Sequence, residues 1–79
     1  MAENAIVWSK DNCPSCAQAK ALLTAEGINY EERLISDGGW TKEQLLEAVP
    51  TARSVPQIFI NDRLIGGFNE LTQYLQEAI

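Results

Sequence analysis

The chain has 79 residues, 46% of them hydrophobic, with a formal net charge of −5 and two cysteines. This length fits one small domain, residues 1–79, and an acidic chain repels phosphate backbones, so we expect no nucleic-acid partner. Two cysteines are too few for a disulfide scaffold, and no run approaches the roughly 20 apolar residues that span a bilayer. Because the N-terminus also lacks the basic and apolar segments of a secretory signal, we expect a cytoplasmic protein.

The first part of the chain predicts a strand–helix–strand unit. An apolar run at Ala5–Trp8 predicts a buried strand. Pro14–Glu26 predicts a helix, with a proline at its first position and Gly27 just after its end. Ile28–Ile35 predicts a second strand, which a right-handed crossover would place parallel to the first.

The middle of the chain predicts a short second helix. It follows a turn at Ser36–Gly39, and Thr41 with Gln44 three residues later forms a capping-box pattern at its start. Pro50 ends it. The residues expected to face the core are Leu45, Leu46 and Val49.

The last part predicts a β-hairpin followed by a helix. Gln57–Ile60 and Arg63–Ile65 form the hairpin strands, Asn61–Asp62 its tight turn, and Gly66–Gly67 breaks the second strand. The final helix begins near Asn69, and its apolar residues recur at helical spacing at Leu71, Tyr74, Leu75, Ala78 and Ile79. The order β-α-β-α-β-β-α predicts an α/β protein with a mixed four-stranded sheet flanked by helices, which is the thioredoxin fold.

The cysteine pair is the strongest functional signal. Cys13 precedes Pro14 at a predicted helix start, where backbone N–H groups and the helix dipole favour an anion. Such a position lowers a cysteine pKa from about 8.5 to roughly 3.5–7.5. We therefore predict thiol–disulfide exchange, with Cys13 as the more exposed nucleophile and Cys16 as the resolving thiol.

Each candidate residue also has a structural interpretation. A zinc site is the alternative for the cysteine pair, but zinc takes four ligands and the chain has no histidine and no second pair. Lys10, three residues before Cys13, either favours the thiolate and an anionic substrate or is a solvated loop lysine. Pro56 suits a strand start whether or not it is functional. Gly66–Gly67 either admits a ligand close to the backbone or forms a flexible turn.

Three motifs in register resemble the glutaredoxin family. They are Ser9-Lys10-x-x-Cys13-Pro14-Ser15-Cys16, Arg53-Ser54-Val55-Pro56-Gln57-Ile58-Phe59-Ile60 and Ile65-Gly66-Gly67-Phe68, within a resemblance that extends from about Ala5 to Tyr74. The resemblance, to a short dithiol bacterial or phage type, implies a glutathione-dependent thiol–disulfide oxidoreductase. It would reduce protein disulfides and glutathione mixed disulfides as a monomer without a bound cofactor, with glutathione as co-substrate. Cys13 would form the mixed disulfide and Cys16 would resolve it.

The resemblance also implies a glutathione site. Lys10, helped by Arg53, would contact the glycine carboxylate of glutathione. The backbone of Val55, held by a cis Pro56, would pair with its cysteine part. The residues implied for the γ-glutamyl end are Gly67, Phe68 and Asn69 for the carboxylate and Glu70 for the ammonium group.

Two positions depart from the family pattern. Ser15 stands where a tyrosine is usual, and Asn69-Glu70 stands where an aspartate is frequent. The small Ser15 leaves room for an alternative function, a [2Fe–2S] carrier in which two chains each contribute Cys13 and two glutathione thiols complete the ligands. A further alternative is that thioredoxin reductase, and not glutathione, reduces the protein, but Lys10 and the glycine pair argue against it. The family suggests ribonucleotide reductase as a protein partner.

Overall fold

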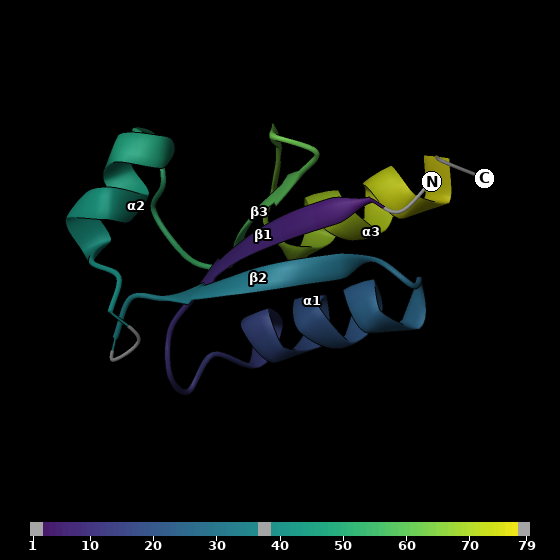
Figure 1. Cartoon of the computed structure of the whole chain (residues 1–79), viewed down its shortest axis with the longest axis horizontal. Helices are drawn as coiled ribbons and strands as arrows, with labels where there is room; N and C mark the ends of the chain where they lie inside the picture. Colours follow the sequence, from purple (N-terminus) through teal and green to yellow (C-terminus); the bar gives the residue numbers. More distant parts are fainter. Residues whose placement is uncertain (1–2, 37–38, 78–79) are drawn as a thin grey trace.

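The computed structural model describes residues 3–36 and 39–77. Its elements run in the order β1 (Asn4–Ser9), α1 (Pro14–Ala25), β2 (Asn29–Leu34), α2 (Lys42–Ala48), β3 (Gln57–Ile60), β4 (Arg63–Gly66) and α3 (Phe68–Glu77) (Figure 1). This is the predicted order, with bounds that agree to within one or two residues. Asp37 and Gly38 of the predicted turn, and Ala78 and Ile79 of the predicted last helix, lie outside the described residues.

The four strands form one mixed sheet in the order β2-β1-β3-β4. β1 is parallel to β2, with Asn4 opposite Asn29, and antiparallel to β3, which is antiparallel to β4. This topology confirms the predicted thioredoxin fold. The second hairpin strand ends within the predicted Gly66–Gly67 break, since Gly66, with a φ of 122°, is the last residue of β4.

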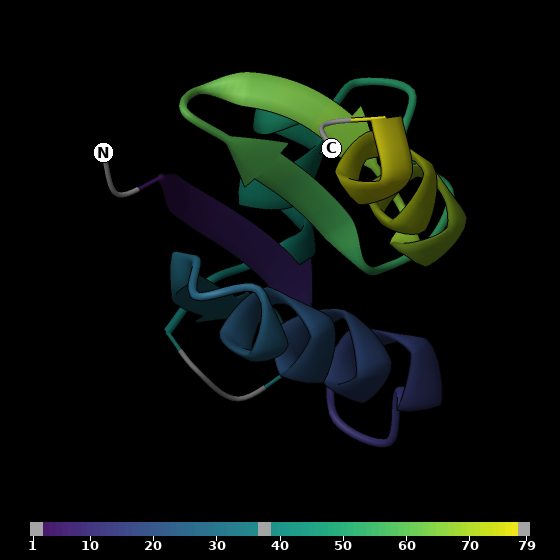
Figure 2. The same cartoon turned by 90° about the vertical axis from the view of Figure 1, so that its right-hand side faces the viewer.

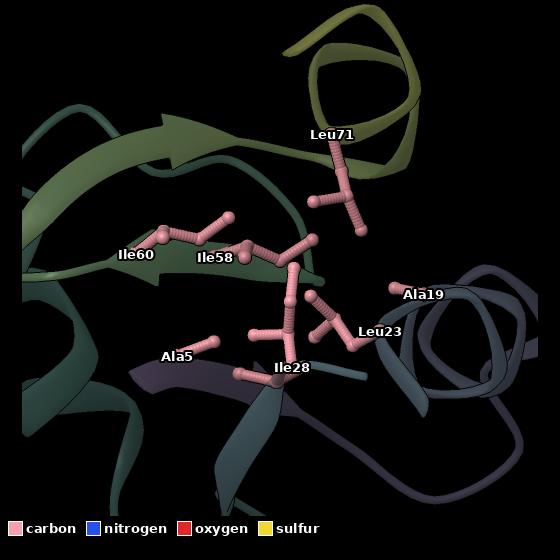
Figure 3. Close-up of a cluster of buried hydrophobic side chains, with 8 residues drawn as sticks. Ala5, Ala19, Leu23, Ile28, Ile58, Ile60 and Leu71 are labelled. Carbon is pink, nitrogen blue, oxygen red and sulfur yellow. The ribbon is translucent and has the colours of Figure 1, made fainter. Parts of the chain in front are cut away.

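Helices cover both faces of the sheet, and Figure 2 shows α1 and α3 on one side with α2 behind. Side chains alternate between the faces along β1, so Val7 packs toward α1 and α3 while Trp8 packs toward α2. The buried cluster on the first face consists of Ala5, Val7, Ala19, Leu23, Ile28, Ile58, Ile60 and Leu71 (Figure 3). The smaller cluster on the second face consists of Trp8, Leu45 and Val49.

Among the described residues, Leu46 is the one predicted core residue that the structure places on the surface. Its exposed fraction is 36%, whereas Leu45 and Val49 are 4% and 3% exposed. The helix is only seven residues long, and residues four apart share its buried side. A residue next to Leu45 points about 100° away from that side, so Leu46 faces solvent.

The predicted turn and capping signals are confirmed. The Thr41 hydroxyl accepts a hydrogen bond from the Gln44 N–H at 3.1 Å, and the Gln44 amide oxygen accepts one from the Thr41 N–H at 2.8 Å. Asn61 and Asp62 have φ angles of 52° and 66°, as a tight hairpin turn with two left-handed residues requires. Among the described residues, no helix has both the length and the apolar character needed to cross a membrane.

Candidate active site

Cys13 is the N-cap residue of α1. Its backbone is extended, with φ −117° and ψ 98°, and Pro14 occupies the first turn. The Cys13 Sγ accepts a hydrogen bond from the Cys16 N–H at 3.2 Å, in the way a serine or threonine oxygen does at an N-cap. The sulfur therefore lies at the positive end of the helix, where a thiolate is stabilised.

Cys13 and Cys16 are joined in a disulfide, with their Cα atoms 5.3 Å apart. Cys13 is half-buried, whereas Cys16 is only 1% exposed. This difference confirms the prediction that Cys13 is the more accessible sulfur. An incoming substrate can therefore reach Cys13 more easily than the buried Cys16.

The segment before β3 lies against the reactive sulfur. The Val55–Pro56 peptide bond is cis, as the family resemblance implied, and the Val55 carbonyl oxygen is 3.8 Å from the Cys13 Sγ. The Val55 N–H makes no hydrogen bond with another described residue. An extended chain bonded to Cys13 could pair with this backbone.

Lys10 and Arg53 are both exposed. Together with Val55 they line a groove of about 290 Å³. Lys10 also lines a larger open pocket of about 630 Å³ beside Cys13 and Cys16. The structure thus brings both predicted cations to one groove beside Val55, although they are 43 residues apart in the sequence.

The N-terminus of α3 lies next to Pro56. A Cβ atom on Gly67 would lie 3.6 Å from the Pro56 carbonyl oxygen. The N–H groups of Phe68 and Asn69, in the first turn, make no hydrogen bond with another described residue. The Glu70 carboxylate folds back and accepts a hydrogen bond from the Gly67 N–H at 2.9 Å, a contact that sequence reasoning did not anticipate.

A polar network beside the pocket was also missed. The buried Ser9 hydroxyl donates to the Glu32 carboxylate at 2.7 Å, and the Lys20 ammonium donates to the same oxygen at 2.6 Å. The hydrogen bond from Lys20, followed by that from Ser9, lowers the pKa of Glu32 despite the opposing effect of burial. Lys20 and Glu32 line the same pocket as Cys16. The available signal was that Lys20 stands one helical turn after Cys16.

Comparison with known proteins decides the family. The glutaredoxin family model matches residues 5–65. The chain belongs to the glutaredoxin family. Glutaredoxin 3 of Escherichia coli K12 is 35% identical over 68 residues, which cover 86% of this chain and 81% of the relative. The chain is therefore a thiol–disulfide oxidoreductase, and its Cys13–Cys16 disulfide fits a dithiol member of the family.

Solved glutaredoxin structures have the same architecture. Glutaredoxin 1 from Francisella tularensis, complexed with cacodylate, superimposes with a TM-score of 0.82 at 27% identity, covering 98% of this chain and 96% of that one. A buckwheat glutaredoxin–glutathione complex gives a TM-score of 0.78 at 28% identity, covering 96% of this chain and 71% of that one. The likeness extends across almost the entire chain.

Proposed function

We propose that this glutaredoxin uses glutathione to reduce protein disulfides and glutathione mixed disulfides. The Cys13 thiolate attacks one sulfur of the substrate disulfide, so that one substrate thiolate leaves and a mixed disulfide forms on Cys13. With a protein disulfide, Cys16 then attacks Cys13, releasing the second substrate thiol and closing the Cys13–Cys16 disulfide. Two glutathione molecules then reduce the Cys13–Cys16 disulfide to two thiols. They supply the two electrons and leave as one molecule of oxidised glutathione.

The position of the Val55 backbone supports glutathione as the thiol. Its carbonyl oxygen is 3.8 Å from the Cys13 Sγ, Lys10 and Arg53 line a groove together with Val55, and the start of α3 lies next to Pro56. Glutathione is an extended tripeptide with a carboxylate at each end and a cysteine between them. A molecule bonded to Cys13 through that cysteine would meet Lys10 and Arg53 at one end and the N–H groups of α3 at the other.

Glu70 has a definite part in this proposal. The helix N-terminus attracts the γ-glutamyl carboxylate, but the same group carries an ammonium ion. The hydrogen bond from the Gly67 N–H holds the Glu70 carboxylate beside this turn. Its second oxygen would accept from the ammonium ion. The site would therefore prefer an amino-acid end over a simple carboxylate.

The direction of the reaction fits a reducing compartment. Glutaredoxins have reduction potentials of about −200 to −230 mV, which a cytosolic glutathione pool can maintain in the reduced form. We accordingly place the protein in the cytoplasm and expect it to act as a monomer. Ribonucleotide reductase, which the family suggests, is a candidate protein substrate. The shared iron–sulfur cluster remains a prediction, for which visible absorbance after anaerobic purification is the test.

The decisive experiment compares two reducing systems. The protein is assayed for reduction of a glutathionylated peptide and of insulin disulfides, once with glutathione and glutathione reductase and once with thioredoxin reductase. Turnover with the glutathione system alone is the expected result. Equal or faster turnover with thioredoxin reductase would contradict glutathione dependence while leaving the thiol–disulfide chemistry intact.

A further inference from the structure

This acidic chain gathers half of its positive charges around one groove. The chain has six lysines and arginines, and three of them line the groove of about 290 Å³ next to Val55, namely Lys10, Lys42 and Arg53. Lys20 and Arg33 are instead paired with glutamates at 2.6 Å. Arg63 begins β4 at the hairpin turn, away from the groove. Within the described residues, no carboxylate lines the groove.

The floor of the groove is apolar. It is formed by aliphatic side chains from α2 and from the segments on either side of it, Ile35, Leu45, Leu46, Ala52 and Val55. Leu46, whose exposed fraction is 36%, lies on the same helix as Lys42. The groove is at the small end of ligand pockets, which are about 300–1,000 Å³. It therefore has room for a few side chains of an extended segment.

The groove has one wall next to the reactive sulfur. Val55 lines it, and the Val55 carbonyl oxygen is 3.8 Å from the Cys13 Sγ. A polypeptide bonded to Cys13 through its own cysteine advances at most about 3.3–3.6 Å per residue. Residues within a few positions of that cysteine can therefore reach α2, which Figure 1 shows beyond the end of β1.

We propose that this groove binds the segment that flanks the reactive cysteine of a protein substrate, and that the segment is acidic and aliphatic. The carboxylates of this segment would contact Lys10, Lys42 and Arg53, while an aliphatic side chain would cover Leu46. The proposal rests on thiol–disulfide exchange at Cys13 and not on glutathione as the reductant. Lys42 and Leu46 lie outside the glutathione site proposed above, so they add selectivity between protein substrates.

The overall charge of the protein predicts the opposite selectivity. A net charge of −5 repels acidic peptides and attracts basic ones over distances of about a Debye length. A groove lined by three cations reverses this preference locally, because charge complementarity at the contact raises the rate of productive encounter. The sign of the peptide preference therefore separates the two effects.

The test uses reduced protein and two peptide disulfides in the absence of glutathione. Each probe is a disulfide-linked homodimer of a short peptide with one cysteine, followed either by Glu-Leu-Glu or by Lys-Leu-Lys. One molecule of dithiol protein reduces one peptide disulfide to two peptide thiols and becomes oxidised at Cys13 and Cys16. The second-order rate constant is measured by acid quenching and mass spectrometry at low and high ionic strength.

The wild-type protein should react faster with the acidic peptide, and Lys42→Glu should lower that preference by about three- to tenfold. Arg63→Glu changes the net charge equally but lies at the hairpin turn, so it should leave the preference within about twofold. Leu46→Ser should slow the acidic peptide by about two- to fivefold, through lost apolar contact. Circular dichroism confirms the fold of each variant.

A preference of the wild type for the basic peptide, or equal effects of Lys42→Glu and Arg63→Glu, would overturn the groove proposal. Since glutathione is absent, neither result bears on whether glutathione is the natural reductant. Conversely, failure of glutathione to reduce the oxidised protein would leave these rate constants unchanged.

Discussion

The Sγ atom of Cys13 and the carbonyl oxygen of Val55 lie 3.8 Å apart, although 42 residues separate them. Cys13 is held by the start of α1 and Val55 by the segment that leads into β3. β1 and β3 are neighbouring antiparallel strands, so the sheet fixes the distance between the two. Because Val55 contributes backbone atoms, this pairing surface is largely independent of the side chain at that position.

The two cysteines should differ sharply on mutation. Cys13→Ser should abolish all turnover, because no other thiol lies at the helix N-terminus. Cys16→Ser should retain reduction of a glutathionylated peptide, since glutathione itself can resolve the adduct on Cys13, and should lose most reduction of protein disulfides. Coupled assays with both substrates measure this. Equal loss of both activities in Cys16→Ser would show that the roles are assigned wrongly.

Lys10→Glu should raise the apparent KM for glutathione about three- to tenfold, because an attractive contact with a carboxylate becomes a repulsive one. Gly67→Ala should also raise it, because a Cβ there would lie 3.2 Å from the Glu70 Oε1 and displace that carboxylate. Reaction of reduced protein with a small neutral disulfide should change far less. Arg63→Glu is the charge control for Lys10→Glu. If both reactions slowed equally with the fold intact, Gly67 would have only a structural role.

Gly66→Ala should destabilise the protein by more than about 1 kcal/mol. Gly66 has a φ of 122°, and a Cβ there would lie 2.9 Å from the Glu70 Cγ. Gly27→Ala is a matched control, because Gly27 has a φ of 73° but no atom within 4 Å of the added Cβ. Urea unfolding of both variants measures the difference. A loss for Gly66→Ala no larger than that for Gly27→Ala would mean that the contact with Glu70 relaxes freely.

Glu32 should contribute a pH-dependent part of the stability. Its pKa in the folded protein is lowered from 4.5 by the hydrogen bonds from Lys20 and Ser9. The contribution is therefore fully present above pH 4.5 and is lost as the pH falls through the lowered pKa. Because the pair is partly exposed, we expect under about 1 kcal/mol. Urea unfolding at neutral and acidic pH measures the free energy of unfolding, which should depend less on pH in Glu32→Gln than in the wild type. Glu47→Gln is the control and should behave like the wild type.

Leu71→Ala should cost about 2–5 kcal/mol, because Leu71 is fully buried between α3 and the sheet (Figure 3). Leu64→Ala is the control, since Leu64 is 45% exposed. It should change the free energy of unfolding by no more than about 0.5 kcal/mol, as is usual for surface positions. Chemical denaturation measures both. Similar losses in the two variants would contradict the assignment of Leu71 to the core.

The sequence determined the order of the elements because each has a local signal. The capping box at Thr41, the apolar period of the last helix and the Asn61–Asp62 turn act within a few residues. The exchange chemistry was equally local, since Cys13 needs only the following proline and helix to lie at a positive helix end. The sequence was misleading at Leu46, because a residue next to Leu45 points about 100° away from the buried side of α2.

Only the tertiary structure decided which distant residues share the site. The sheet order places Val55 against Cys13 and the start of α3 against Pro56, and no local pattern gives those distances. The polar network of Ser9, Lys20 and Glu32 joins three elements, so its members had no common signal in the chain. The groove also depends on the tertiary structure. Lys42 lines it together with Lys10 and Arg53 only because α2 packs on the sheet, and no local pattern in the sequence brings these three cations together.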